Sequence, residues 1–294
     1  MERSNLTKLF VKRLTNLDFS FLDPKRGLVG ESWLIDIELS GQLNEQGMVL
    51  DFGVVKRLVK DYIDQYIDHC LLVPIHYQGC DINESGQHLE VTFQLEDGKE
   101  IVHRSIPNAV AKIPAERITS LSIRTFLLEQ LQPLLPANVA SLEISLYSEP
   151  GLEQSYQYSH GLRKHLGNCQ RIAHGHRSGL QIYVDQKVSS NWQKHWFEKW
   201  QDIYIGTRKH LLEDGSCEED ACEEGYYQFE YQVQQGKFFL KLPKDHCYII
   251  DVESTVENIA QHLAEEIAVQ ESGKEVQVIA YEGIDKGAIA TLTV

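Results

Sequence analysis

The apolar residues in the first half of the chain follow two different periods. Trp33, Ile35, Ile37 and Leu39 alternate with more polar neighbours, which predicts an antiparallel strand with one buried face. Between residues 51 and 67, apolar residues recur three or four positions apart, which predicts an amphipathic helix. The first part of the chain therefore combines sheet and helix.

A hairpin, a second helix and a further strand follow. Residues 89–95 and 101–106 are strand-like and flank a turn near Asp97-Gly98, which favours a hairpin. Residues 119–135 predict the helix, and residues 142–147 predict the strand.

The second half repeats this order of elements. The segments 93–131 and 231–267 both run strand, glycine turn, strand, proline and helix, which indicates an internal duplication. We therefore expect two α+β domains, residues 1–151 and 152–294. The elements expected in the second half are residues 181–184, 192–212, 228–233, 238–242, 255–269 and 276–281.

Composition narrows the class of protein. The chain has 294 residues, of which 42% are hydrophobic, so each domain can bury a core. No apolar run is long enough for a bilayer, and no secretory signal follows the charged N-terminus, so we expect a soluble cytosolic protein. The formal net charge of −15 argues against nucleic acid as a partner.

The cysteines and the basic residues carry further information. Six scattered cysteines favour reduced thiols over a disulfide framework. Cys217 and Cys222 lie in an acidic loop without a second pair, so we do not expect a structural metal there. Between residues 155 and 184 there is no acidic residue. This stretch suits a small anionic ligand or is a chance fluctuation among exposed charges, and its basic residues are Arg163, Lys164, Arg171 and Arg177.

The strongest chemical signal is His174-Gly175-His176, with His160 upstream. Residues two apart on a strand face the same side, about 6.5–7 Å apart, so two imidazoles can converge on one ion. A third ligand from His160 leaves one tetrahedral position open, as in catalytic zinc sites. Gly175 would allow another backbone or a substrate to approach closely. Cys169, beside a cation and Arg171, would be a base or nucleophile, or else an inert buried thiol.

Several motifs resemble those of the 6-pyruvoyltetrahydropterin and 6-carboxytetrahydropterin synthase family. Tyr158-Ser159-His160, Cys169 and His174-Gly175-His176 are similar to its F-S-A-A-H, Cys and H-G-H pattern. The other similar segments are residues 47–52 (G-M-V-x-D-F), Asp68-His69 with Leu71 (D-H-x-x-L), residues 254–258 (P-T-x-E-N) and Tyr281-Glu282-Gly283.

The resemblance implies a fold and an assembly. Each domain would be a T-fold (tunnelling fold), an antiparallel four-stranded sheet with two helices on one face. Subunits of this family associate into barrels with ligand sites at the seams, so we expect a closed homo-oligomer.

The motifs are divided between the two halves. The first half has no histidine before His69, so the positions that match the zinc ligands, around residues 22–23 and 29–31, cannot bind metal in the family's way. The second half has the ligands and Cys169, while its position for the acid–histidine pair reads Lys209-His210. We therefore expect Asp68 and His69 of one copy to complete the zinc site of another.

Two assignments remain open at this stage. Asp245-His246 is a rival for the acid–histidine pair, although it aligns with Pro107-Asn108 of the first half. Glu257, three residues after Ser254, either binds substrate together with Thr255 or closes a capping box at the start of a helix.

The resemblance also implies a reaction, the loss of triphosphate from 7,8-dihydroneopterin triphosphate. Zn²⁺ on His160, His174 and His176 would polarise the substrate side chain, and Cys169 would remove a proton with Asp68 and His69 as partners. Glu282 would bind the pterin ring. The triphosphate would be bound by Arg163 and Arg177, together with Lys164 and Arg171.

Two other functions fit the sequence. The product of the synthase reaction would be a 6-pyruvoyl or a 6-carboxy pterin. As an alternative to an enzyme, the chain would be a pterin- or purine-binding protein without catalysis. It is also compatible with a tandem T-fold enzyme acting on GTP or a deazapurine. About one tightly bound zinc ion per chain would favour an enzyme.

Overall fold

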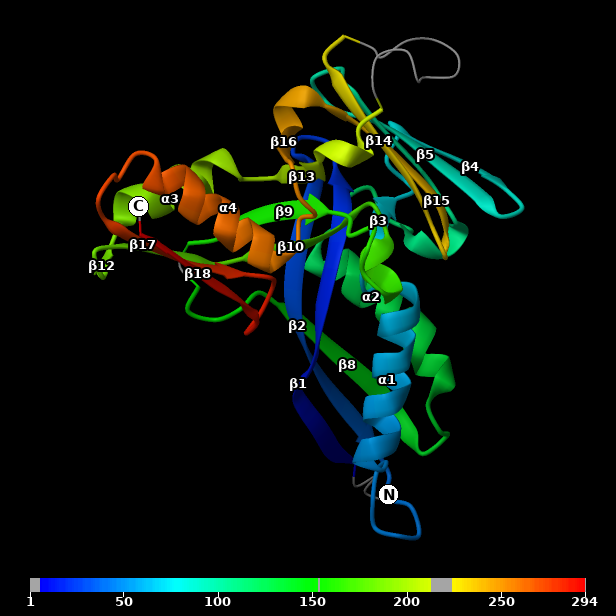
Figure 1. The fold of residues 1–294 in the computed structure, drawn as a ribbon. Helices are drawn as coiled ribbons and strands as arrows, with labels where there is room; N and C mark the ends of the chain where they lie inside the picture. Colours follow the sequence, from blue (N-terminus) through cyan, green and yellow to red (C-terminus); the bar gives the residue numbers. More distant parts are fainter. Residues whose placement is uncertain (1–5, 153, 213–223, 294) are drawn as a thin grey trace.

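The computed structural model describes residues 6–152, 154–212 and 224–293, and its fold is α+β (Figure 1). A long antiparallel hairpin dominates the first half, and its sheet has the order β7-β3-β1-β2-β8. The strands are β1 (Thr7–Asp23), β2 (Gly27–Gly41), β3 (Leu71–Pro74), β7 (Val110–Ile113) and β8 (Val139–Tyr147).

Two helices cover one face of this sheet, α1 (Phe52–Tyr66) and α2 (Ser120–Leu131). Asp51 caps α1, because its carboxylate accepts hydrogen bonds from the amides of Gly53 and Val54. Val55, Val59 and Ile63 recur every four residues and are fully buried. The helix predicted at residues 51–67 is therefore confirmed, and the second predicted helix ends at Leu131, four residues early.

The second half forms two four-stranded sheets, β10-β9-β13-β16 and β12-β11-β17-β18. Helices α3 (Ser190–Lys199) and α4 (Val256–Ala268) pack on them around a core that includes Trp196 and Trp200. The strands are β9 (Tyr156–His160), β10 (His174–Ser178), β11 (Leu180–Val184), β12 (Lys187–Val188), β13 (Ile203–Thr207), β16 (Cys247–Ile250), β17 (Glu275–Tyr281) and β18 (Gly287–Thr293).

A fourth sheet joins the two halves, with the order β14-β15-β6-β5-β4. Strand β15 pairs with β6, so that Phe239 lies opposite Arg104. Side chains from both halves, such as Leu28 and Leu240, share one core beneath it. Its strands are β4 (Cys80–Ser85), β5 (His88–Gln94), β6 (Glu100–Ser105), β14 (Tyr226–Val233) and β15 (Gly236–Pro243).

This arrangement differs from the expected single four-stranded antiparallel sheet in each half. In the first half, the parallel strands β3 and β7 extend the hairpin sheet to five strands. In the second half, the corresponding strands β13 and β16 form a separate four-stranded sheet with β9 and β10.

The helix predicted at residues 192–212 is wrong beyond Lys199. Trp200 ends α3, and Asp202 has a positive φ of 57°, which a continuing helix does not allow. Ile203, Tyr204 and Ile205 then form buried strand β13, which agrees with the strand preference of β-branched and aromatic residues.

The two halves touch where β9 and β10 cross β1 and β2 (Figure 1). Gly30 and Gly175 meet at this crossing. A Cβ on Gly30 would lie 1.9 Å from the carbonyl oxygen of Tyr158, and one on Gly175 would lie 2.7 Å from the Cα of Gly30. The hydroxyls of Ser20 and Ser159 hydrogen-bond across the same crossing at 2.7 Å. Glycine is therefore required at both positions by the approach of the backbones.

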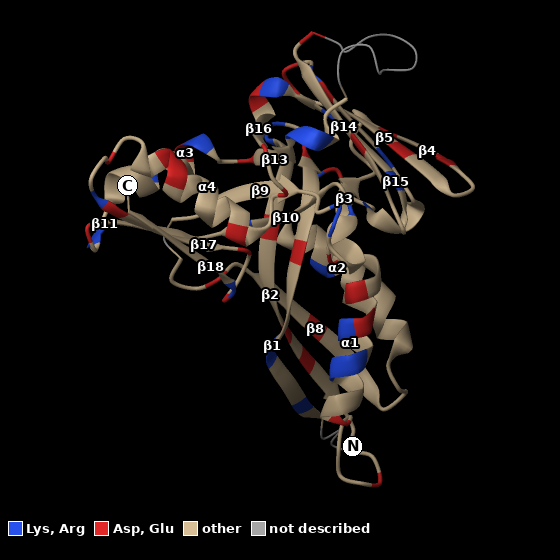
Figure 2. Cartoon of the chain, viewed as in Figure 1, with Lys and Arg blue, Asp and Glu red and all other residues tan. Residues whose placement is uncertain are grey.

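The distribution of charged residues and the state of the cysteines can be compared with what the composition predicted. Lys and Arg are interspersed with Asp and Glu on the same elements, as on α1 (Figure 2). The cysteines of the described residues, Cys70, Cys80, Cys169 and Cys247, are free. Cys217 and Cys222 lie outside the described residues. In the described part of the chain, every helix is too short or too polar to cross a membrane.

Candidate metal centre and acid–base pair

Three histidines of the second half converge at the crossing. His160 ends β9 and lies opposite His174 on β10, with His176 two residues further on. The ring centroids of His160 and His174 are 4.4 Å apart, and those of His174 and His176 are 5.7 Å apart. One nitrogen of each ring lies within 4.8 Å of the others, and all three residues are buried.

The rings present unpaired nitrogens to one another. Nδ1 of His160 donates to the carbonyl oxygen of Ser254 at 2.9 Å, and Nδ1 of His174 donates to that of Arg171 at 3.0 Å. The Nε2 atoms of His160, His174 and His176 are buried, without a hydrogen-bond partner among the described residues. Three rings with orphaned nitrogens and with ligand atoms within 4.8 Å of one another are a donor set that fits a tetrahedral metal ion with an open position.

The protonation of these rings also suits a metal. Burial, with repulsion from the neighbouring histidines, holds the pKa of His160 and that of His174 well below the usual 6.5. Both rings are therefore neutral near pH 7, and their Nε2 lone pairs are free to bind a cation.

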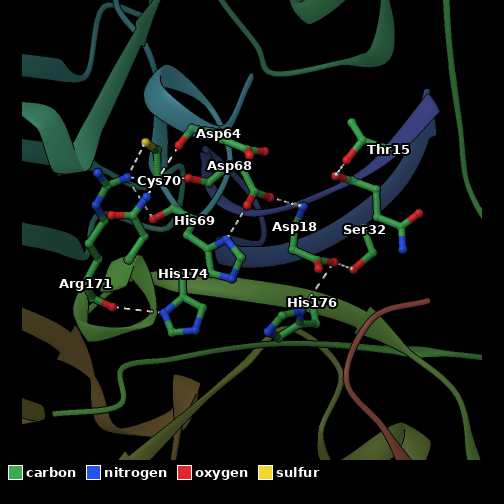
Figure 3. A network of polar contacts seen from close by, with 12 residues as sticks. Thr15, Asp18, Ser32, Asp64, Asp68, His69, Cys70, Arg171, His174 and His176 are labelled. Atoms are coloured by element: carbon green, nitrogen blue, oxygen red, sulfur yellow. Dashed lines mark hydrogen bonds and ion pairs between the residues drawn. The ribbon is translucent and has the colours of Figure 1, made fainter. Parts of the chain in front are cut away.

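An acid–histidine pair from the first half lies against this cluster (Figure 3). His69 follows α1 in a left-handed conformation with φ of 56°, and its Nδ1 donates to the carboxylate of Asp68 at 2.5 Å. Its ring centroid is 5.2 Å from that of His174 and 6.3 Å from that of His176. Ligand atoms of His69, Cys169 and His174 also lie within 4.8 Å of one another.

His69 is a charged group in this position. Burial by itself lowers its pKa, but the hydrogen bond to Asp68 and the contact with Cys169 outweigh burial and raise the pKa to about 10. The imidazole is therefore protonated near pH 7 and can donate a proton.

A second carboxylate, Asp18 on β1, lies behind His176. Its Oδ1 is 3.3 Å from Nδ1 of His176, and its Oδ2 is 3.2 Å from Nζ of Lys286. The Ser32 hydroxyl donates to Oδ1. Burial opposes the charge, but His176 and Lys286 outweigh it and hold the Asp18 pKa well below its usual range.

The first half of the chain matches a known protein family. The model of the 6-pyruvoyl tetrahydropterin synthase family matches residues 13–152. The first half of the chain is therefore similar to this family. This match ends before His160, His174 and His176. No curated protein matches the chain.

Solved structures of this synthase resemble half of the chain. Two from Plasmodium vivax, one of them a catalytic-residue mutant, are 21% identical and cover 50% of this chain and 94% of theirs, with TM-scores of 0.41 and 0.42. One from Plasmodium falciparum is 18% identical and covers 49% of this chain and 93% of its own, with a TM-score of 0.41.

The two hairpins show which residues of the first half stand where the histidines would be. Ser20 lies opposite Gly30, as Ser159 lies opposite Gly175. The counterpart of His160 is therefore Phe21, one residue before the expected 22–23. The counterparts of His174 and His176 are Val29 and Glu31, within the expected 29–31. The first half of the chain thus has no imidazole at these positions.

The counterpart of Asp68-His69 in the second half differs from the expectation. Leu71 lies opposite Ser20, as Tyr204 lies opposite Ser159. Counting back two and three residues makes Gln201-Asp202 the counterpart, in place of Lys209-His210. Asp202 has the same positive φ as His69 and binds Arg26 through two hydrogen bonds, at 2.6 and 2.8 Å.

The rival pair Asp245-His246 makes its contacts elsewhere. It lies in the 3₁₀ helix Lys244–His246, which corresponds to the 3₁₀ helix Pro107–Ala109 of the first half. The strand registers match Asp245-His246 to Asn108-Ala109, one residue after the expected Pro107-Asn108. The carboxylate of Asp245 binds Lys99 at 2.6 Å, and the His246 ring lies beside Gly27. Of the two candidate pairs, Asp68-His69 is therefore the one in contact with His174 and His176.

The basic residues do not form one patch. The Arg171 guanidinium is buried and donates to the sulfur of Cys70 and to the carbonyl oxygens of Asp68 and His69. Arg163 and Lys164 are exposed on the loop before Cys169. Arg177 is the strand neighbour of His176 and points to the opposite face. The Arg171 guanidinium therefore contacts the backbone of the first half, and its role in binding an anionic ligand stays a prediction.

The remaining substrate-binding candidates separate into two groups. Oε1 of Glu282, just after β17, lies 3.9 Å from Nε2 of His176. Thr255 is the N-cap of α4 and accepts from the amide of Asn258. Glu257 is exposed in the first turn. The N-cap is therefore Thr255 and not the expected Ser254, whose carbonyl and hydroxyl oxygens instead contact His160.

Sequence reasoning missed Asp18, Ser32 and Lys286, and it gave Ser254 a different role, in a helix cap. Asp18 carried a usable signal, since it is the charged residue among the alternating apolar residues Leu17, Phe19 and Phe21 of one strand. Ser32 and Lys286 are ordinary polar residues in the sequence. Ser32 lies opposite Asp18 in the β1–β2 hairpin, whereas the crossing of the two halves brings Lys286 to Asp18.

Proposed function

We propose that this protein is a zinc-dependent lyase of the pterin synthase type. Its substrate is 7,8-dihydroneopterin triphosphate, and its product is a 6-pyruvoyl or 6-carboxy tetrahydropterin formed with loss of triphosphate. The observation that carries the proposal is the convergence of three buried, unpaired Nε2 atoms, those of His160, His174 and His176, beside His69 and Cys169.

We assign the metal to the three histidines of the second half. Zn²⁺ at this position supplies a Lewis acid that polarises the oxygens of the substrate side chain. Glu282, beside His176, is placed to accept hydrogen bonds from a heterocyclic amide edge.

Proton transfer falls to residues on both sides of the crossing. Cys169 is assigned as the base that removes a proton from the substrate side chain. Its neighbour His69, protonated and held by Asp68, returns a proton to the developing anion. Arg171 fixes this pair through the carbonyl oxygens of residues 68 and 69.

We further propose that the chain is a duplicated T-fold, divided near residue 151. The support is the shared register of the two hairpins, in which Ser20 and Gly30 match Ser159 and Gly175. In this view one of two equivalent sites kept the metal ligands and the other lost them. The seam between the copies lies within one chain.

The test combines metal analysis with turnover. Purified protein is expected to hold about one zinc ion per chain and to convert dihydroneopterin triphosphate to a tetrahydropterin that is identified by mass. The mass also separates the pyruvoyl from the carboxy product. Protein that holds zinc but turns over GTP or a deazapurine would instead be a different enzyme. Protein that binds pterin without zinc or turnover would be a binding protein.

A further inference from the structure

Asp18 is the residue through which the first half contacts both parts of the site. Its side chain is 5% exposed and lies between Nδ1 of His176 and Nζ of Lys286, with the Ser32 hydroxyl donating to it. It stands on β1, in the opposite half of the chain from the three histidines (Figure 3).

The three histidines differ in what holds their Nδ1 atoms. His160 and His174 each donate to a backbone carbonyl oxygen of the second half, those of Ser254 and Arg171. For His176, the Asp18 carboxylate lies 3.3 Å from Nδ1, and the ring makes no hydrogen bond with the described residues. Histidine ligands of metals usually donate their other N–H to a carbonyl or carboxylate, which fixes the tautomer and the ring orientation. Asp18 is therefore positioned to complete this third contact.

The main chain of Asp18 holds the acid–base pair. Its amide donates to Oδ1 of Asp68 at 2.9 Å, and its carbonyl oxygen accepts from the amide of His69 at 2.7 Å. The same residue is thus bonded to the acid–histidine pair through its backbone and faces a metal ligand with its side chain.

We propose that Asp18 is a positioning residue for the metal centre. Its carboxylate accepts Nδ1–H of His176, so that Nε2 faces the ion, while its backbone keeps Asp68 and His69 at a fixed place beside that ion. This inference rests on the proposed metal-dependent function. It adds that a residue of the first half, Asp18, orients a metal ligand of the second half, His176.

The test is the affinity of the protein for zinc, measured by competition with a chromophoric chelator. Asp18→Asn keeps the size of the side chain and removes its charge. It is expected to weaken zinc binding about 10- to 100-fold while leaving one ion per chain at saturation. Asp36→Asn is the matched control, because Asp36 is also a buried carboxylate of this hairpin, but it binds Lys12, Tyr147 and the amide of Arg13. Its zinc affinity should equal that of the wild type.

A second readout separates positioning from general stability. The visible absorption bands of the Co²⁺-substituted protein are expected to shift in Asp18→Asn and to stay unchanged in Asp36→Asn. Should Asp18→Asn not fold, Ser32→Ala removes the hydroxyl that holds the carboxylate, and a several-fold loss of zinc affinity is expected there.

The outcomes distinguish the two proposals. Wild-type protein that binds zinc, with Asp18→Asn binding it equally well, overturns the role of Asp18 and leaves the proposed function intact. Wild-type protein that binds no zinc overturns the metal centre and, with it, this role.

Discussion

At the residue scale, the site depends on a few polar side chains that are buried or half-buried in pairs. Asp68 with His69 and Asp18 with His176 each join a carboxylate to an imidazole within 3.3 Å. Taking such groups from water is costly unless each is matched by a partner, so removing one member affects the other.

The first prediction concerns His69. In His69→Gln the protonated group beside Cys169 is lost, while the three metal ligands remain. We expect kcat to fall roughly 10²- to 10⁴-fold, the usual contribution of a positioned acid or base, with zinc content unchanged. Steady-state kinetics and metal analysis of one preparation measure both. Unchanged turnover would remove His69 from the mechanism.

The second prediction concerns Glu31, the counterpart of His176. Burial raises its pKa to about 7, against the opposing charges of Arg177 and Arg26. Between about pH 4.5 and 7 the folded chain therefore holds a proton that the unfolded chain has lost, so the contribution of Glu31 to stability falls as the pH rises. Relative to the wild type, Glu31→Gln should gain up to about 3 kcal/mol in the free energy of unfolding across this range.

Urea unfolding with a metal chelator present, at intervals from pH 5 to 8, measures that difference. Glu143→Gln, at an exposed position on β8, is the control and should run parallel to the wild type. A gap between Glu31→Gln and the wild type that does not change with pH would contradict the prediction.

The sequence allowed much of the site to be anticipated, and physical reasons explain what it did not. The spacing of His174 and His176 is a local property of a strand, so their convergence was predictable, as was the division of the motifs between the halves. The contacts of Asp18 and Arg171 depend on how two distant hairpins cross. We predicted that Arg171 binds a ligand because the sequence alone does not distinguish a buried guanidinium, bonded to carbonyl oxygens, from an exposed one.

At the element scale, the paired hairpins decide the geometry. The strand and helix periods gave many elements to within a few residues, for example α4 and β17, but they did not predict β1, β4 or β18. The short parallel strands β3, β7, β13 and β16 were missed, because buried runs of four or five residues have no distinctive period. Residues 203–207 were joined to the preceding helix for the same reason.

The third prediction concerns the crossing of the hairpins. In Gly30→Ala the added Cβ meets the carbonyl oxygen of Tyr158 at 1.9 Å and the amide of His176 at 2.6 Å, so the strands must separate. We expect a loss of at least about 2 kcal/mol in stability. Zinc affinity should also fall, because His176 lies at the contact.

Gly53→Ala in α1 is its control, where the nearest atom is the flexible carboxylate of Asp51 at 3.0 Å. That change should leave zinc affinity unchanged and stability within about 1 kcal/mol of the wild type. Equal behaviour of the two alanine variants in thermal unfolding and zinc titration would refute the role of the crossing.

At the scale of the whole molecule, the two halves are not independent units. The sheet β14-β15-β6-β5-β4 and the core beneath it contain residues of both, and the crossing adds the contact between Gly30 and Gly175. A chain with a shared core is expected to unfold in one cooperative step.

The fourth prediction tests that cooperativity. Leu240→Ala leaves a cavity in the shared core and should cost about 2–5 kcal/mol. Denaturation followed by circular dichroism reports both halves, while tryptophan fluorescence mainly reports the second, which contains Trp192, Trp196 and Trp200. The circular dichroism and fluorescence curves should coincide in the wild type. In Leu240→Ala both curves should shift by the same amount. Two separated transitions would show that the halves unfold independently.

The covalent link between the halves also sets how the site responds to dilution. His69 and His176 meet within one polypeptide, so their encounter is a unimolecular event with a high effective concentration. Where separate subunits must supply such residues, specific activity declines once the protein is diluted below its dissociation constant. Here the histidine cluster and the Asp68-His69 pair stay together at any concentration, even if higher assemblies come apart.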